Sequence, residues 1–153
     1  MEAAPVRVCF SPEGQCTDGI VHAIQEATSS IYVQAYGFTC LPIAQALVTA
    51  KNKGVNVQVI LDKSQITAKK SQLPLLLENN ISVSIDSVSG IAHNKIMIID
   101  NLYVLTGSFN FTNAADSRNA ENVLLIKDSE LARMYKENWE KRAILSRAYT
   151  GGI

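Results

Sequence analysis

The residues best suited to chemistry in this sequence lie between positions 93 and 121. His93 and Lys95 come first, Ser108 and Asn110 follow, and Glu121 is the last. An imidazole can act as a nucleophile or a general acid, and an ammonium neutralises anionic oxygens. Hydroxyl and amide groups add neutral hydrogen-bond donors. Together these groups are suited to the cleavage of a phosphate ester.

Strand geometry predicts which of these side chains share a face. Because positions two apart on a strand point the same way, His93 and Lys95 should lie side by side. The ammonium would bind non-bridging phosphate oxygens and favour the neutral, nucleophilic form of the imidazole. Ser108 and Asn110 would donate to the same oxygens from a loop that Gly107 opens.

Three other polar residues are interpreted differently. Asp100 is an odd number of positions from His93, so a regular strand directs it to the opposite face. It also lies at a predicted hairpin turn, where Asp accepts backbone N–H bonds, and we interpret it as structural. Taken by itself, Glu121 would be a solvated carboxylate near the start of a strand. His22 lies in an amphipathic helix without a basic, hydroxyl or amide partner at meaningful spacing, and it is interpreted as a helix-surface residue.

The elements that must position these groups alternate in type. Strands are expected over residues 6–10, 31–36, 55–61, 81–85, 92–100, 103–105 and 122–126. Helices are expected to begin near Thr17, Pro42, Ser71 and Ser129, the last of them running to about Ala148. The opening strand–helix–strand order favours parallel strands with crossover helices. We therefore predict one domain over residues 1–153, a layered α/β/α sandwich with a mixed, largely parallel sheet.

Composition limits the class of protein. The chain has 153 residues, of which 47% are hydrophobic, and its 14 basic side chains balance 14 acidic ones. Zero net charge argues against bulk attraction to nucleic acid, so a polyanion site would have to be a local cluster. Lys63, Lys69 and Lys70, after the third strand, could contribute to one or form an ordinary solvated surface. No stretch approaches 18 apolar residues, which predicts no membrane span.

Cysteines and the N-terminus leave the compartment open. Cys9 and Cys16 could form a disulfide in an oxidising compartment, but base rates favour buried free thiols. No His or Cys spacing resembles a zinc site. The stretch Met1–Pro5 lacks the basic and apolar regions of an export signal, although its small residues would also fit the remainder of a cleaved one.

The spacing of the site residues is similar to that of a known motif. The pattern His93-x-Lys95-x4-Asp100-x6-Gly107-Ser108-x-Asn110 resembles the complete HKD motif of the phospholipase D superfamily. Residues 10–12, 33–39 and 57–62 also resemble the small, single-motif bacterial members of that family. The resemblance covers nearly the whole chain, and the match to one of those bacterial proteins looks close to identity.

This resemblance implies a phosphodiesterase that needs no metal or other cofactor. In that family the motif His attacks phosphorus, and a phosphohistidine forms while a second His protonates the leaving oxygen. The second His then deprotonates the water that clears the intermediate. Carried onto this chain, the resemblance implies that His93 is the nucleophile. It implies that Lys95 and Asn110 bind the phosphate oxygens and that Ser108 supports the pocket. It makes Glu121 the acidic residue that orients a catalytic His.

The chain carries one copy of the motif, whereas the larger family members carry two. One imidazole cannot hold both protonation states at once, so a C2 homodimer would bring His93 of both subunits to one shared site. Two imidazoles and two ammonium groups there would form a local anion trap despite zero net charge. The resemblance further implies residence in the periplasm.

Three functions compete on this basis. The first is a sequence-non-specific endonuclease acting on single- or double-stranded DNA, with RNA left open, because so short a chain has no room for a base-reading module. The second is a phosphodiesterase or phosphatidyl transferase acting on lipid head groups. It is less favoured, and no stable membrane association is expected, because the last helix has a stripe suited to the core. That stripe consists of Leu131, Met134, Tyr135, Asn138, Trp139, Arg142 and Leu145. The third, a catalytically silent phosphate-binding dimer, is disfavoured because a retained nucleophile has no binding advantage over Arg or Lys.

Overall fold

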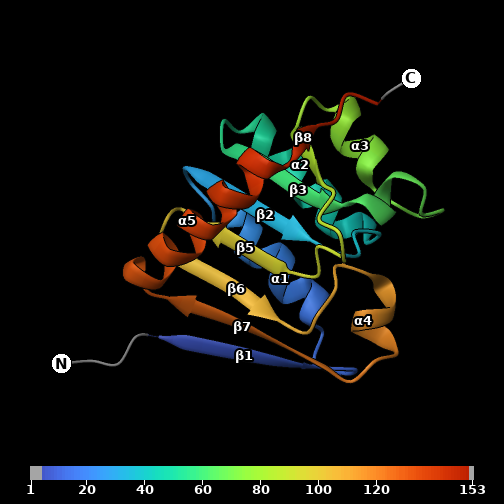
Figure 1. The fold of residues 1–153 in the computed structure, drawn as a ribbon. Coiled ribbons are helices and arrows are strands. Elements are labelled where there is room, and N and C mark those ends of the chain that lie inside the picture. Colours follow the sequence, from blue (N-terminus) through green and yellow to red (C-terminus); the bar gives the residue numbers. More distant parts are fainter. Residues whose placement is uncertain (1–4, 152–153) are drawn as a thin grey trace.

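A computed structural model describes residues 5–151 of the chain. In this part, one sheet has the strand order β1-β7-β6-β5-β2-β3-β4-β8 (Figure 1). Its strands are β1 (Val6–Ser11), β2 (Ser30–Ala35), β3 (Asn56–Asp62), β4 (Ser82–Asp86), β5 (Lys95–Ile99), β6 (Tyr103–Gly107), β7 (Glu121–Lys127) and β8 (Arg147–Ala148). The helices are α1 (Cys16–Gln25), α2 (Leu41–Asn52), η1 (Lys63–Ile66), α3 (Leu73–Glu78), α4 (Asn113–Ser117) and α5 (Ser129–Leu145).

The sheet is mixed but mostly antiparallel. The parallel pairs are β2–β3 and β3–β4, and each is linked by a helical crossover. The pairs β1–β7, β2–β5, β4–β8, β5–β6 and β6–β7 are antiparallel. The α/β class and the mixed sheet are confirmed, whereas the prediction of a largely parallel sheet is wrong. The error concerns β1, which pairs with the distant β7 at the sheet edge, because periodicity identifies a strand without identifying its neighbour.

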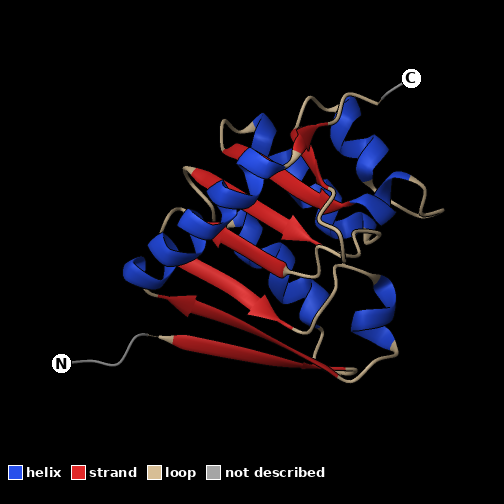
Figure 2. Ribbon diagram, in the orientation of Figure 1, coloured by secondary structure: helices blue, strands red, loops and turns tan. Residues whose placement is uncertain are grey.

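Helices cover both faces of the sheet, as the predicted sandwich requires (Figure 2). The larger core lies between the sheet and α1, α2 and α3, and its fully buried members include Ile24, Ile31, Leu47, Leu61 and Leu76. A smaller core lies under α5, where Trp139 packs with Ile60, Ile98 and Val104. The Trp139 indole N–H also donates to the Val33 carbonyl at 2.9 Å, which fixes α5 against the centre of the sheet.

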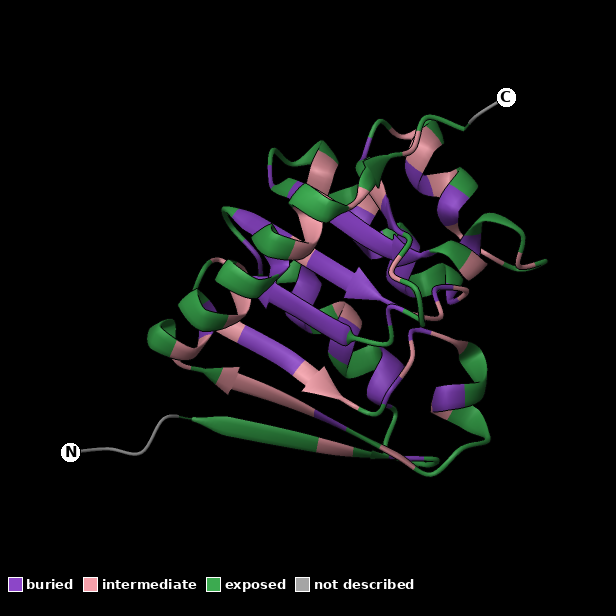
Figure 3. Cartoon of the chain, viewed as in Figure 1, coloured by how far each residue is buried: buried purple, intermediate pink, exposed green. Residues whose placement is uncertain are grey.

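On the α5 side, the sheet is uncovered over β1. Register places Val8 beside Leu124, Leu124 beside Thr106 and Thr106 beside Ile96, so these side chains share the face on which α5 packs. Because α5 lies over the middle of the sheet, the β1 side chains on that face remain open (Figure 3). Val6, Val8 and Phe10 are 55%, 52% and 64% exposed. We call these three residues the β1 apolar face.

The long last helix begins as predicted and ends earlier. Asp128 caps it by accepting the N–H groups of Glu130 and Leu131. It stops at Leu145, short of Ala148, because the chain turns into the edge strand β8. Of the stripe predicted for the core, Trp139 is buried, but Met134 and Leu145 are 56% and 68% exposed. That stripe is therefore only partly a core face.

The segment after Thr112 and the prediction of no membrane span can also be compared with the structure. The polar composition of residues 112–120 predicts a loop, whereas the structure has the short helix α4 there. The Thr112 side chain caps this helix by accepting the N–H of Ala115 at 3.1 Å. No helix within residues 5–151 has the length and apolar character needed to cross a bilayer. Residues 1–4, weighed above as an export signal or its remainder, lie outside the described part of the chain.

Candidate active site

Antiparallel pairing brings distant segments to one end of the sheet. Strand β5 begins at Lys95, which lies opposite Ala35, the last residue of β2. Strand β7 begins at Glu121, opposite Ser11 at the end of β1, and β6 ends at Gly107 beside them. The same end therefore holds the carboxyl ends of β1, β2 and β6 and the amino ends of β5 and β7 (Figure 1). A purely parallel sheet would have separated these residues.

His93 and Lys95 are in contact. The Lys95 ammonium nitrogen lies 3.2 Å from Nδ1 of His93 and donates to the His93 carbonyl at 2.7 Å. His93 precedes β5 instead of lying in it, so the strand is shorter than predicted, yet the two side chains meet. His93 is exposed, whereas Lys95 is 9% exposed. Burial lowers the pKa of the Lys95 ammonium, and the charge of Glu121 opposes that effect in part.

Tyr36 is a site residue that sequence reasoning gave no role. Its ring packs edge-on against the His93 imidazole, with ring centroids 4.8 Å and planes 65° apart. The Lys95 ammonium lies 5.9 Å from the centre of the same ring. Tyr36 follows β2 directly, and only the antiparallel pairing of β2 with β5 places it beside His93. Its position at the carboxyl end of a buried strand was the one available signal.

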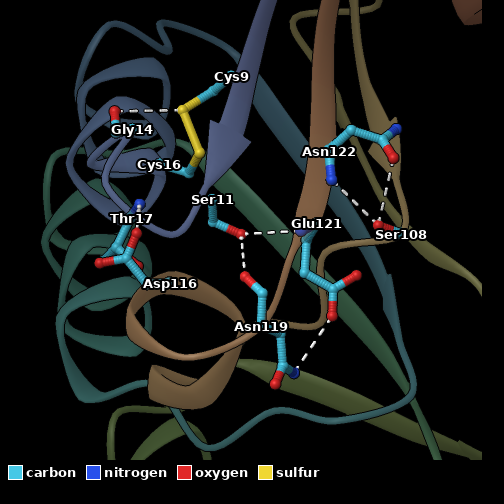
Figure 4. Close-up of a disulfide and its surroundings, with 10 residues drawn as sticks. All are labelled: Cys9, Ser11, Gly14, Cys16, Thr17, Ser108, Asp116, Asn119, Glu121 and Asn122. Atoms are coloured by element: carbon cyan, nitrogen blue, oxygen red, sulfur yellow. Dashed lines mark hydrogen bonds between the residues drawn. A yellow bond between two sulfur atoms is a disulfide. The ribbon is translucent and has the colours of Figure 1, made fainter.

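The segment after β6 is held by both of its neighbours. Gly107 has φ 155°, and a Cβ there would lie 2.2 Å from the Asn122 carbonyl, so a side chain would force β6 and β7 apart. The Ser108 hydroxyl accepts the Asn122 N–H at 3.1 Å (Figure 4). The Asn110 side-chain oxygen accepts the Gly37 N–H at 3.3 Å. This contact turns the amide oxygen of Asn110 toward the backbone that follows β2.

Glu121 is held at the corner between β1 and β7 (Figure 4). Its backbone N–H donates to the Ser11 hydroxyl at 3.2 Å, and that hydroxyl donates to the Asn119 carbonyl at 3.0 Å. The Glu121 carboxylate accepts the Asn119 side-chain N–H at 3.2 Å. Within the described residues no hydrogen bond joins Glu121 to His93, so its effect inside one chain is on the charge of Lys95.

The same corner carries a disulfide, which corrects one interpretation. Cys9 on β1 is bonded to Cys16 at the start of α1, with their Cα atoms 5.7 Å apart (Figure 4). The preference for free thiols is wrong for this pair and holds for Cys40, which is buried and free. The sequence could not show that β1 turns straight back onto α1 and brings the two sulfurs together. The bridge closes the loop that contains Ser11.

Asp100 and His22 lie away from this end. Asp100 is at the far end of β5, and its carboxylate accepts the backbone N–H groups of residues 28–30 at 2.7 to 3.2 Å. Burial by itself would raise the pKa of this carboxyl, but the N–H bonds outweigh it and the pKa is lowered. His22 is exposed in the last turn of α1, 3.3 Å from Glu26. Asp100 therefore joins the β5–β6 turn to the start of β2.

The three lysines after β3 differ in their surroundings. Lys63 donates to the carbonyls of Val88, at 3.0 Å, and Gly90. Lys69 and Lys70 are exposed in the following loop. Lys63 is therefore committed to holding backbone, which removes it from the set of groups that could bind an anion.

An exposed imidazole beside a buried ammonium, with amide donors next to it, defines a phosphodiesterase-type site on an α/β sheet. Residues 20–143 match the family described as "Cardiolipin synthase, PLD-like domain". The chain belongs to the phospholipase D superfamily and is a phosphodiesterase of that family.

Curated relatives extend this likeness. The protein named phospholipase D from Rickettsia prowazekii is 50% identical over 143 residues, which is 94% of this chain and 70% of the relative. The mitochondrial cardiolipin hydrolase of Mus musculus is 33% identical over 134 residues, 87% of this chain and 61% of the relative.

Solved structures show the same fold. Nuc from Salmonella typhimurium, a phospholipase D family member, superposes with a TM-score of 0.91 at 38% identity, covering 96% of this chain and 99% of that one. NucT from Helicobacter pylori has a TM-score of 0.87 over 96% of this chain and 100% of that one, at 24% identity, which supports the fold alone. The 38% identity makes this chain a clear relative of Nuc, well short of near identity.

Proposed function

We propose that this protein is a metal-independent endonuclease that hydrolyses DNA phosphodiester bonds without sequence preference, through a phosphohistidine at a site shared by two subunits. The observation that carries the proposal is the contact between His93 and Lys95 at an exposed sheet end. The structural neighbour named Nuc, at 38% identity, favours nucleic acid as the substrate. Contacts to phosphate alone carry no sequence information, which accounts for the absence of preference.

The contact also indicates how the site responds to substrate. A bound phosphodiester offers the Lys95 ammonium a stronger acceptor than Nδ1 of His93. The ring proton can then occupy Nδ1, and Nε2 attacks phosphorus while the bond to the leaving oxygen breaks. A second imidazole gives its proton to that oxygen and next takes one from water, which displaces His93 and completes the hydrolysis.

One chain supplies only one imidazole to this site. The sequence has two His residues. His22 lies in the last turn of α1, which leads to residues 28–30 and hence to Asp100 at the opposite end of β5. A five-residue strand is about 16 Å long, so His22 cannot reach the phosphate that His93 attacks. A second copy related by a two-fold axis supplies the missing general acid.

The β1 apolar face supports association with a second copy. Val6, Val8 and Phe10 are each more than half exposed on one strand, and they lie on the same face as the packed core under α5. Contiguous exposed apolar side chains of this kind mark interaction surfaces. Phe10 is adjacent to Ser11 and pairs with Asn122. This end of the β1 apolar face therefore reaches the sheet end that holds the site, although Lys95 and Glu121 alternate to the opposite face of the sheet.

A lipid head group is the second candidate substrate. The Rickettsia relative named phospholipase D is 50% identical, against 38% for Nuc. The core stripe that made this reading less favoured is incomplete, since its members Met134 and Leu145 are exposed on α5, as is the neighbouring Ile144. Exposed apolar side chains of this kind suit contact with a lipid surface, and the test below therefore includes lipid vesicles.

The proposal includes residence in the periplasm. The Cys9–Cys16 disulfide supports it, because such bonds persist in oxidising compartments and are rare in the cytosol. Fractionation of cells producing the native gene product, with the disulfide assayed in each fraction, tests this part.

The test of the function measures the cleavage rates of several substrates by the same enzyme preparation in excess chelator. Unrelated single-stranded and double-stranded DNA, RNA, and phosphatidylcholine vesicles are supplied separately. We expect cleavage of every DNA sequence, and a reaction quenched with denaturant at alkaline pH should carry phosphate on His93 that acid then releases. Choline release without DNA cleavage would favour the lipid reading, and loss of activity on chelation would contradict the mechanism. His93→Ala should be inactive while His22→Ala keeps full activity.

A further inference from the structure

The segment that delivers His93 is fixed by charged groups outside the proposed chemistry. Residues 87–92 connect β4 to His93 without regular secondary structure. An irregular segment of this kind would normally be mobile, which would blur the position of a nucleophile. Four charged side chains from β3, η1, β4 and α5 hold it instead, namely Asp62, Lys63, Asp86 and Arg142.

The first half of the segment is held by Asp86 and Lys63. Arg142 donates to both carboxylate oxygens of Asp86, at 2.7 and 2.8 Å, and Asp86 is 1% exposed. The Asp86 carboxylate also accepts the Val88 N–H at 3.1 Å. Lys63 donates to the carbonyls of Val88 and Gly90. Both polar groups of the Val88 backbone are thus bound.

The second half is held by Asp62. One of its carboxylate oxygens accepts the N–H of Ala92 at 2.8 Å, one residue before His93. The other accepts the N–H of Ser64 at 3.0 Å, which turns η1 back toward β3. Asp62 is 1% exposed. Asp62 is therefore a buried group that binds the residue next to the nucleophile, although it lies thirty-one positions before His93 in the sequence.

Asp62 and Asp86 are register partners on the parallel strands β3 and β4. Two buried carboxylates side by side would normally resist ionisation, and Asp62 does raise the pKa of Asp86. The Arg142 bonds outweigh this at Asp86, and backbone N–H bonds outweigh burial at Asp62, so both pKa values are lowered. All four carboxylate oxygens are engaged by protein donors, which makes this pair a fixed anchor.

We propose that Asp62, Asp86 and Arg142 are positioning residues that fix the 87–92 segment and thereby set the orientation of the His93 ring for attack on phosphorus. The inference rests on the nucleophilic role proposed for His93. It links the C-terminal half of α5 to the chemistry, although Arg142 makes no contact with the reacting groups. A residue that merely stabilised the fold would leave the His93 ring unchanged in every folded variant.

The experiment uses the two histidines of the chain as probes. In a 1H–13C spectrum of untagged protein, His93 and His22 give separate ring signals, and His22 serves as an internal control. The variants are Asp62→Asn, Arg142→Lys and Arg142→Met, with Arg133→Met as the matched control. Arg133 also pairs with carboxylates on α5, Glu130 and Glu137, but on the exposed side of the helix.

We expect the three anchor variants to shift or broaden the His93 signal without moving that of His22. Their kcat on a phosphodiester should fall about 10- to 100-fold with less than about a threefold change in KM, since displacement of a reacting group costs rate before binding. Arg142→Lys should lie between Arg142→Met and the native protein. Arg133→Met should change neither signal nor kcat.

An unmoved His93 signal and unchanged kcat in folded Asp62→Asn or Arg142→Lys would overturn the positioning role. The spectrum does not depend on turnover, so this failure is separate from failure of the proposed function. If His93→Ala remained active, the nucleophilic role would be wrong whatever the anchor variants showed.

Discussion

The buried Lys95 ammonium lies 3.2 Å from Nδ1 of the exposed His93 ring, so one group of the pair is shielded from water while the other faces it. Shielding strengthens the attraction of the ammonium for phosphate oxygens, and exposure lets the imidazole reach them. The pair therefore separates charge stabilisation from nucleophilic attack. Both tasks are tested by changing Lys95.

Lys95→Met should lower kcat/KM on phosphodiesters by about 100- to 1,000-fold, because a fixed donor to the transition-state oxygens is lost. Lys95→Arg should not restore the rate, since the planar guanidinium fork cannot place a donor where the compact ammonium lies, 3.2 Å from Nδ1 of His93. Steady-state kinetics with both variants measures this. Retention of more than about a tenth of the rate by Lys95→Met would count against its proposed contact with phosphate.

Glu121→Gln should move the alkaline limit of activity to lower pH. Burial lowers the pKa of Lys95 and the Glu121 charge raises it in part, so removal of that charge lowers the pKa further. The ammonium is then lost at a lower pH on the alkaline side. The pH profile of kcat/KM measures the change, with Glu26→Gln, at the far end of α1, as the control. A shift toward higher pH would contradict the assigned coupling.

Asp100→Asn should destabilise the fold by about 1 to 3 kcal/mol while the folded protein keeps its activity. The carboxylate accepts three backbone N–H groups that a neutral amide satisfies poorly. Because folding lowers the Asp100 pKa, its stabilisation is present above about pH 4 and is lost as pH falls through the folded value. Urea unfolding at pH 7 and pH 3 should show the two proteins converging at low pH. Equal stability at pH 7 would show that these bonds contribute nothing.

Val8→Asp should weaken association and activity together, because it buries a charge in the proposed interface. Sedimentation measures the oligomeric state. Lys141→Asp, an exposed change on α5, is the control.

A mixture of native and His93→Ala chains tests whether the site is shared. If it is, the activity of co-refolded mixtures should fall as the square of the fraction of native chains. A linear decline, or a fully active monomer, would rule out a shared site.

The denatured, unreduced protein should show one reactive thiol, from Cys40, and three after reduction. Reduction should lower the free energy of unfolding by about 2 to 3 kcal/mol, the value for a short closed loop. Thiol titration and urea unfolding measure the two effects. Three reactive thiols before reduction would show that Cys9 and Cys16 are free, as base rates had favoured.

Sequence reasoning was most accurate where the cause of structure is local. Hydrophobic periodicity predicted the bounds of β2, β3 and α2 and the start of α5 to within a few residues. It succeeded because an element that buries one face has apolar residues at regular spacing in the sequence. The contact between His93 and Lys95 followed from their spacing of two, even though His93 lies outside the strand. Asp100 was separated from them by the same reasoning.

Long-range relationships were not readable in that way. The edge position of β1, the Cys9–Cys16 bond and the place of Tyr36 beside His93 all depend on which strands become neighbours. The anchor of Asp62, Asp86 and Arg142 depends on α5 crossing the sheet to reach β4. None of these follows from periodicity, since many pairings bury the same apolar faces.

By itself, the sequence determined the α/β class, the family and the residue types of the site, because these are set by local pattern and motif spacing. The tertiary structure alone decided that β5 and β7 run antiparallel to β2 and β6, which gathers His93, Lys95, Asn110 and Glu121 at one end of the sheet. The physical reason is that strand pairing is chosen by the packing of the whole core, and no single segment carries that information.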